Sequence, residues 1–159
     1  MIPGFNGDGV LPHGRYQATV DEVEHRFVEP FVASATRKNI YDGWRKRREE
    51  LLSIVDVEWE WVDGSFVTAK SNAGDIDLAT FIHETELAAL TIPQRQRVSE
   101  LTVGPHPKLA FGCHSFLVIL DEAHPFYNAY LQQCGYWDRQ WSKDKTVPGK
   151  GYIEVREAR

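Results

Sequence analysis

Strict alternation of apolar and polar residues over two short stretches constrains the fold of this chain more than any other feature. Residues 57–61 read Val-Glu-Trp-Glu-Trp, and residues 75–79 read Asp-Ile-Asp-Leu-Ala. Successive side chains of a strand point to opposite faces, so each stretch is predicted to form a half-buried strand. The largely apolar residues 115–120 and the stretch 151–155 predict two further strands.

Helical patterns separate these strands. Thr19, with Glu22 three residues later, forms a capping box that predicts a short helix to about residue 28. Longer helices are expected over residues 33–52, 84–101 and 125–134, the second of these restarting at Pro93 with Thr91 as candidate cap. Strands mixed with helices predict an α/β (α+β) fold: a small mixed sheet with helices packed on it, in a single domain over residues 1–159.

Two segments are interpreted as connecting or surface structure. Residues 1–18 are expected to form a loop-rich N-terminal arm, because glycines, prolines and the turn dipeptides Asn-Gly and Asp-Gly crowd its first part. The basic run at residues 45–48 lies in the predicted helix 33–52. We interpret it as a solvated helix face, with a binding patch as the alternative.

Charge and cysteine content narrow the classes of protein. A net charge of −5 argues against general DNA binding and against an anionic membrane surface, since both need excess positive charge. Cys113 and Cys134 supply neither a disulfide framework nor a CxxC zinc pair. The first residues lack the pattern of a signal peptide, and the longest apolar run is too short to span a membrane. A cytoplasmic protein is therefore expected.

The chemistry is concentrated in residues 62–78. A strand runs into Gly64 and Ser65, and such a Gly-Ser turn at the start of a short helix suits phosphate, because free backbone amides and the helix dipole attract anions. Asp75 and Asp77 share one face of the next strand, so their carboxylates can converge on one hard cation. Together the two elements are suited to displacing pyrophosphate from a nucleoside triphosphate with a divalent metal.

This combination resembles the signature of the DNA polymerase beta superfamily of nucleotidyltransferases. The resemblance implies an NTP substrate, a triphosphate held by Gly64 and Ser65, and Mg²⁺ (or Mn²⁺) bound by Asp75 and Asp77. Residues 5–14, 63–70 and 150–155 are also similar to a family of short bacterial and phage nucleotidyltransferase-like proteins. That likeness implies a toxin–antitoxin or phage-defence setting.

The resemblance also implies a third carboxylate on a later strand, and the strand at 111–120 has no acid in its interior. His114 or Ser115 stands where the acid is expected, and His114 is a candidate base or metal neighbour as well as a candidate structural histidine. Asp121, at the far end, is a candidate third acid, with capping of the next turn as the alternative. Lys70 is a candidate phosphate contact between the turn and the aspartates.

Three functions remain open on these residues. The first is a metal-dependent nucleotidyltransferase that moves a nucleoside monophosphate to an unknown acceptor, which can be a protein, RNA or a small molecule. The second is a catalytically degenerate member that binds nucleotide or acts as an interaction subunit, and the third is a phosphohydrolase. The basic and aromatic residues 139–150 are a candidate grip on a base or acceptor, with a solvated loop as the alternative. A protein partner is a further candidate, because a chain this short leaves little room for an acceptor-binding domain.

Overall fold

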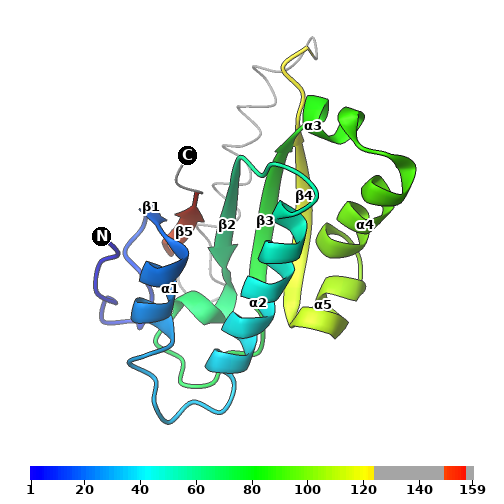
Figure 1. The fold of residues 1–159 in the computed structure, drawn as a ribbon. Helices are drawn as coiled ribbons and strands as arrows, with labels where there is room; N and C mark the ends of the chain where they lie inside the picture. Colours follow the sequence, from blue (N-terminus) through cyan, green and yellow to red (C-terminus); the bar gives the residue numbers. More distant parts are fainter. Residues whose placement is uncertain (124–148, 157–159) are drawn as a thin grey trace.

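The computed structural model describes residues 1–123 and 149–156. Their strands form one five-stranded mixed sheet of order β1-β5-β2-β3-β4 (Figure 1). β2 is antiparallel to both of its neighbours, whereas β1 pairs with β5, and β3 with β4, in parallel. The predicted mixed α/β fold is confirmed. The strands are β1 (Arg15–Ala18), β2 (Trp59–Asp63), β3 (Ile76–His83), β4 (Cys113–Leu120) and β5 (Tyr152–Val155).

The first two helices begin by different local devices. α1 (Val20–Phe27) has the predicted capping box, in which the Glu22 amide donates to the Thr19 hydroxyl and the Glu22 carboxylate accepts from the Thr19 amide. α2 (Arg37–Leu52) begins later than predicted. The Ser34 hydroxyl accepts from the amides of residues 36 and 37, and this local turn precedes the helix.

The predicted helix 84–101 is two helices, α3 (Glu84–Ala89) and α4 (Ile92–Thr102). The restart follows the expected logic, since Thr91 caps α4 and a proline stands in its first turn. A further short helix, α5 (His106–Phe111), was not predicted. Gly112 ends α5 in the left-handed conformation at φ 69° and leads directly into β4.

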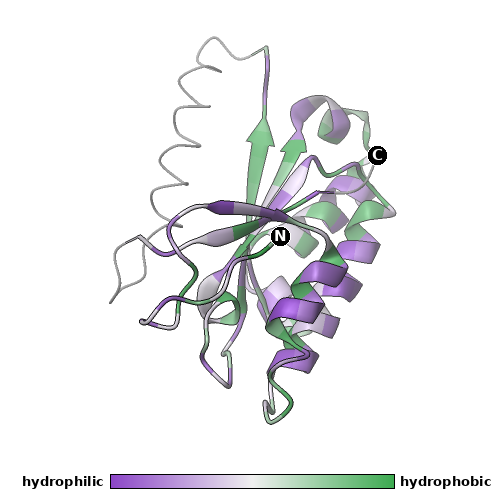
Figure 2. Ribbon diagram, turned by 90° about the vertical axis from the view of Figure 1, so that its left-hand side faces the viewer, coloured by the Kyte–Doolittle hydropathy of each residue, from purple (hydrophilic) through white to green (hydrophobic). Residues whose placement is uncertain are grey.

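The helices of the described residues lie on one side of the sheet, as the two perpendicular ribbon views show (Figures 1 and 2). Alternation along each strand divides its side chains between this helix-covered face and the opposite face. On β3, Ile76, Leu78 and Ile82 belong to the main core, and Ala79 and Phe81 belong to a second apolar cluster. That second cluster consists of Trp61, Ala79, Phe81, Val118, Leu120 and Tyr152.

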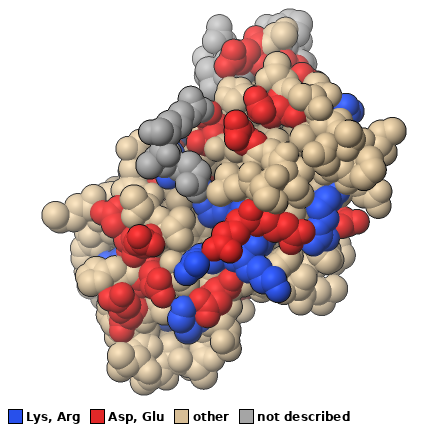
Figure 3. Space-filling model, viewed as in Figure 1, with Lys and Arg blue, Asp and Glu red and all other residues tan. Residues whose placement is uncertain are grey.

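The prediction that the basic run 45–48 of α2 forms a solvated face is wrong for two of its four residues. Arg45 and Lys46 are exposed, but Arg47 and Arg48 are buried and both form ion pairs with the buried Glu60 of β2. On the side of the molecule seen in Figure 3, acidic and basic side chains interleave across the middle of the surface, whereas acidic side chains gather at the left and near the top.

The N-terminal arm is more ordered than expected. Its last four residues form β1, which pairs with β5 from the other end of the chain. Earlier in the arm, Val10 forms a bridge with Thr68, and the Ala69 amide donates to the Gly9 carbonyl at 2.7 Å. The arm therefore lies against the segment that follows the Gly-Ser turn.

No helix within the described residues is long and apolar enough to cross a membrane. The predicted helix at 125–134 and most of the basic-aromatic stretch 139–150 lie outside the described residues.

Candidate functional site

The candidate site lies where β2 ends and where β3 and β4 begin. Asp63, the last residue of β2, is directly opposite Asp77 of β3, and Asp77 is directly opposite His114 of β4. Directly paired residues on neighbouring strands point to the same face, with Cβ atoms roughly 5 Å apart. Three titratable side chains therefore form a row across the sheet, on the face away from the main core.

Gly64 brings the backbone of the turn against this row. It has φ 80°, a left-handed conformation that favours glycine, and it begins the short 3₁₀ helix η1 (Gly64–Val67). A Cβ atom at this position would lie 2.5 Å from Oδ2 of Asp77. The Ser65 hydroxyl accepts from the Gly74 amide at 3.1 Å, which ties the turn to the residue that precedes Asp75. The two halves of the sequence motif are thus in contact.

Asp75 and Asp77 are each about one-third exposed and each faces a positive or ionisable group. Lys108 Nζ of α5 lies 3.1 Å from Oδ2 of Asp75, and His114 Nδ1 lies 3.0 Å from Oδ1 of Asp77. Both partner side chains are at least half exposed, so little packing holds them in place. An incoming cation could take their positions without disturbing the core.

An ion pair that was not predicted lies under the turn. Lys150 Nζ lies 2.5 Å from Oδ1 of Asp63 and donates to the Gly64 carbonyl at 2.9 Å. Burial raises the pKa of Asp63 to about 7, against the opposing charge of Lys150, and the negative charge of Asp77 adds to the rise. Asp63 directly precedes the Gly-Ser turn, and this position is the sequence feature that could have identified it as a site residue. Lys150 comes from a distant segment.

Arg37, which was not predicted as a site residue, organises the loop behind the turn. Its buried guanidinium donates to the carbonyls of Phe66, Thr68 and Lys70 at 2.6–2.7 Å, and to that of Phe27 at 2.9 Å. Burial lowers the pKa of Arg37 to about 10, so it stays charged at neutral pH. One side chain thus fixes the path of the chain from η1 to the aspartates. Nothing local in the sequence marks this role.

Three stretches that are distant in sequence meet around Gly64. The N-terminal arm contacts the loop after η1 through Gly9, and it contacts the C-terminal stretch through the hydrogen bond from the Gly151 amide to the Leu11 carbonyl. Lys150 in turn reaches Gly64. The stretches that carry the likeness to the short nucleotidyltransferase-like family therefore form one structural unit.

The remaining predicted site residues are placed less favourably. Asp121 follows the far end of β4, seven strand positions from His114, and its carboxylate accepts from the Ala123 amide. Asp121 thus caps the turn that follows β4, which is the alternative role predicted for it, and it does not lie near Asp77. Ser115 is buried on the opposite face, where it accepts from Arg47. Lys70 is exposed, and its backbone carbonyl accepts from Arg37 while its backbone amide donates to the Thr68 hydroxyl.

The donor set fits a metal that arrives with its substrate. Mg²⁺ is usually bound through one or two carboxylates together with phosphate oxygens and water. Asp77, at the start of β3, and Asp75, directly before that strand, could supply two such carboxylates. In the part of the chain that the structure describes, no three His, Cys, Asp or Glu side chains form a group that could hold a metal alone. These two carboxylates would hold a metal only together with other ligands, such as phosphate oxygens and water.

Fold and site together define a small α/β protein with paired aspartates beside a Gly-Ser turn. Residues 3–156 match the model of a family described as a family of unknown function, DUF6932. The chain belongs to the DUF6932 family. No curated protein and no solved structure matches it. Membership of the nucleotidyltransferase superfamily therefore stays a prediction.

Proposed function

We propose that the protein is a metal-dependent nucleotidyltransferase that moves a nucleoside monophosphate from an NTP to an acceptor hydroxyl. The observation that carries the proposal is the close approach of the Gly64 backbone to the carboxylate of Asp77. The absence of a side chain on Gly64 lets the backbone of the turn lie directly beside this carboxylate, so a phosphate held by the amides of the turn would lie next to a cation held by Asp77. A Gly-Ser turn alone or an aspartate alone would not indicate nucleotidyl transfer. Their contact places a phosphate-binding turn beside a metal-binding carboxylate, and the reaction needs both.

Each residue has a role that follows from its position. The amides that begin η1 and the Ser65 hydroxyl hold the triphosphate, while Asp75 and Asp77 hold Mg²⁺ or Mn²⁺. The bound metal supplies neutralisation of the phosphate charge in the transition state. Arg37 and Lys150 keep the turn in place from behind, through its carbonyls.

In the proposed transfer, the acceptor oxygen forms a bond to the α-phosphorus. The bond from that phosphorus to the bridging oxygen breaks, and pyrophosphate leaves with the bonding electrons. The acceptor loses its hydroxyl proton to a base, and His114, half exposed beside Asp77, is the described residue in place for this role. The acceptor, whether protein, RNA or small molecule, approaches from the side opposite pyrophosphate, because displacement at phosphorus is in line.

Transfer of label tests the proposal. The full chain is incubated with each NTP radiolabelled at the α-phosphate, Mg²⁺ or Mn²⁺, and cell lysate, and pyrophosphate and labelled products are measured. Asp77→Asn and Asp75→Asn should each reduce transfer at least a hundredfold, whereas Asp121→Asn, at the other end of β4, should leave it unchanged. The proposal would be wrong if no labelled product formed, or if the Asp77→Asn variant labelled the acceptor as well as the unmodified protein does. Free phosphate in place of pyrophosphate would indicate a phosphohydrolase.

One observation favours a second candidate, a nucleotide-binding or interaction subunit without turnover. His114 lies directly opposite Asp77, so the neighbouring strand contributes an imidazole where a third carboxylate is expected. Calorimetry that detects binding of NTP with Mg²⁺, in the absence of pyrophosphate release with any acceptor fraction, would support this function over transfer.

A further inference from the structure

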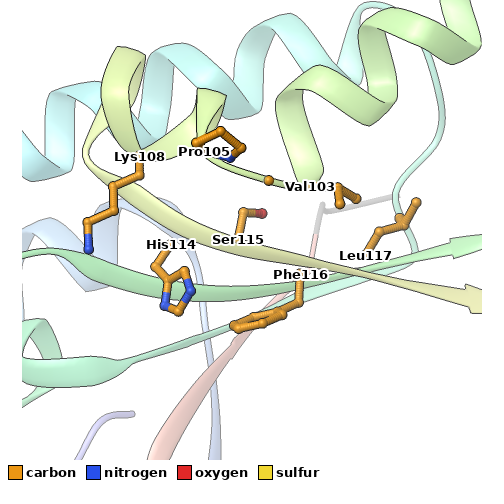
Figure 4. Close-up of a pocket in the computed structure, with 8 residues that line it drawn as sticks. Val103, Pro105, Lys108, His114, Ser115, Phe116 and Leu117 are labelled. Carbon is orange, nitrogen blue, oxygen red and sulfur yellow. The ribbon is translucent and has the colours of Figure 1, made fainter.

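A cavity of about 530 Å³ adjoins the candidate site along β4, the strand at the end of the sheet order. Val103 and Pro105 from the segment between α4 and α5 line it together with Lys108 of α5. Residues 114–117 of β4 complete the wall (Figure 4). Its volume lies within the roughly 300–1,000 Å³ that small-molecule sites occupy.

The cavity has two chemically different ends. Lys108 and His114 lie at one end, and Val103 and Leu117 lie toward the other (Figure 4). The first two are the side chains that contact Asp75 and Asp77, so the polar end opens onto the candidate site. The His114 and Phe116 rings lie 4.8 Å apart on the aspartate-bearing face and add an aromatic surface beside the opening. A ligand that fits has an anionic end and a flat, weakly polar end.

The order of elements across the sheet places such a ligand. The Gly-Ser turn follows β2, Asp75 directly precedes β3 and Asp77 belongs to it, and the cavity borders β4, so these features follow one another across the strands. Neighbouring strands are about 4.8 Å apart. A triphosphate that begins at the turn and passes over the aspartates therefore delivers its nucleoside to the β4 side.

We infer that this cavity is the nucleoside subsite, in which the base of the NTP lies between Val103 and Leu117 and the sugar passes Lys108 and His114. The inference rests on the proposed function and adds the location of the site that binds the base. The side chains of Val103 and Leu117 carry no hydrogen-bonding group that would distinguish the edge of one base from that of another. We accordingly expect weak discrimination among the four NTPs.

The test compares a ligand that has a nucleoside with one that lacks it. Affinities of the full chain for ATP and for inorganic tripolyphosphate, each with Mg²⁺, are measured by calorimetry. Val103 is about half exposed and has extended backbone angles, so Val103→Trp can fill the apolar end without disturbing the core. Leu109→Trp, on the exposed surface of α5, is the matched control. Val103→Phe repeats the test with a smaller ring, and thermal melting verifies that each variant folds.

Val103→Trp should weaken ATP binding about tenfold or more, because the indole occupies the space of the base, and leave tripolyphosphate binding unchanged. Unchanged ATP binding, or equal weakening of both ligands, would overturn the subsite. Unchanged ATP binding with loss of acceptor labelling would assign the cavity to the acceptor and overturn it too. Failure of the unmodified protein to bind either ligand would instead refute the proposed function, and the subsite with it.

Discussion

Gly64 and Asp77 are so close that a methyl group on Gly64 would lie 2.5 Å from the Asp77 carboxylate. The glycine also has φ 80°, which costs an alanine about 1–2 kcal/mol. Gly64→Ala should therefore lower the free energy of unfolding by about 2 kcal/mol and displace Asp77. Under the proposed function, the transfer activity of Gly64→Ala should fall by more than the loss of folded protein accounts for.

Gly74→Ala is the matched control, because a Cβ atom there meets nothing within 4 Å in the same loop. Urea unfolding and labelled-NTP transfer are measured for both variants. Equal effects of the two substitutions would contradict the role given to the contact between Gly64 and Asp77.

Arg37 should be essential to the loop that carries the turn. Arg37→Met leaves several buried carbonyls without a donor, and each such loss costs about 1–3 kcal/mol, so we expect destabilisation of about 3 kcal/mol or more. Arg37→Lys should recover only part of this, since one ammonium cannot reach all of these carbonyls. Arg45→Met, on the exposed face of α2, should change the unfolding free energy by less than about 1 kcal/mol. Chemical denaturation followed by circular dichroism distinguishes these outcomes.

Glu60 should make stability fall at low pH. Burial alone would raise the pKa of its carboxyl, but the charges and hydrogen bonds of Arg47 and Arg48 outweigh burial and lower the pKa from 4.5 to about 2. A carboxyl with a lowered folded pKa stabilises the protein above its unfolded pKa, and this stability is lost as pH falls from about 4.5 toward 2.

Glu60→Gln leaves two buried guanidinium groups without their counter-charge, and it should cost about 3–5 kcal/mol at pH 7. The variant should also lose part of the pH dependence between 4.5 and 2. Glu49→Gln, in an exposed pair with Arg45, is the control, and melting temperature against pH is the measurement. A Glu60 variant that keeps the full acid dependence would refute the assignment.

Under the proposed function, a third carboxylate would belong at position 114, because His114 lies directly opposite Asp77. His114→Asp should raise the affinity for Mn²⁺ in the presence of tripolyphosphate about tenfold, or 1.4 kcal/mol, by adding an oxygen ligand on the same face. Ser115→Asp should not, since Ser115 points to the helix-covered face and bonds to Arg47. Electron paramagnetic resonance titration reports free Mn²⁺, and a gain with Ser115→Asp alone would reverse the assignment.

Local sequence signals predicted several elements correctly. The capping box at Thr19, the restart at Pro93 and the alternation along β2 and β3 all arise from neighbours within a few residues. The short strand β1 and the helix α5 were missed. β1 depends on a partner more than a hundred residues away, and α5 is a single helical stretch of six residues.

The charged residues show the limit of sequence analysis more sharply. Arg45 and Arg47 belong to one basic run, yet one is exposed and the other is buried against Glu60. Which arginine is buried depends on where the helix lies on the sheet. The partners of the candidate site, Lys108 and Lys150, likewise come from segments that no local pattern connects to the aspartates.

By itself, the sequence determined the α/β class, the turn at Gly64 and the alternation along β2 and β3, because turns and strand alternation are properties of neighbouring residues. Only the tertiary structure decided that Asp77 lies beside Gly64, that His114 and not Ser115 faces it, and that Asp121 lies far away. Those relationships depend on strand order and register. Both are set by packing between segments distant in the chain, where a shift of one residue exchanges the two faces of a strand.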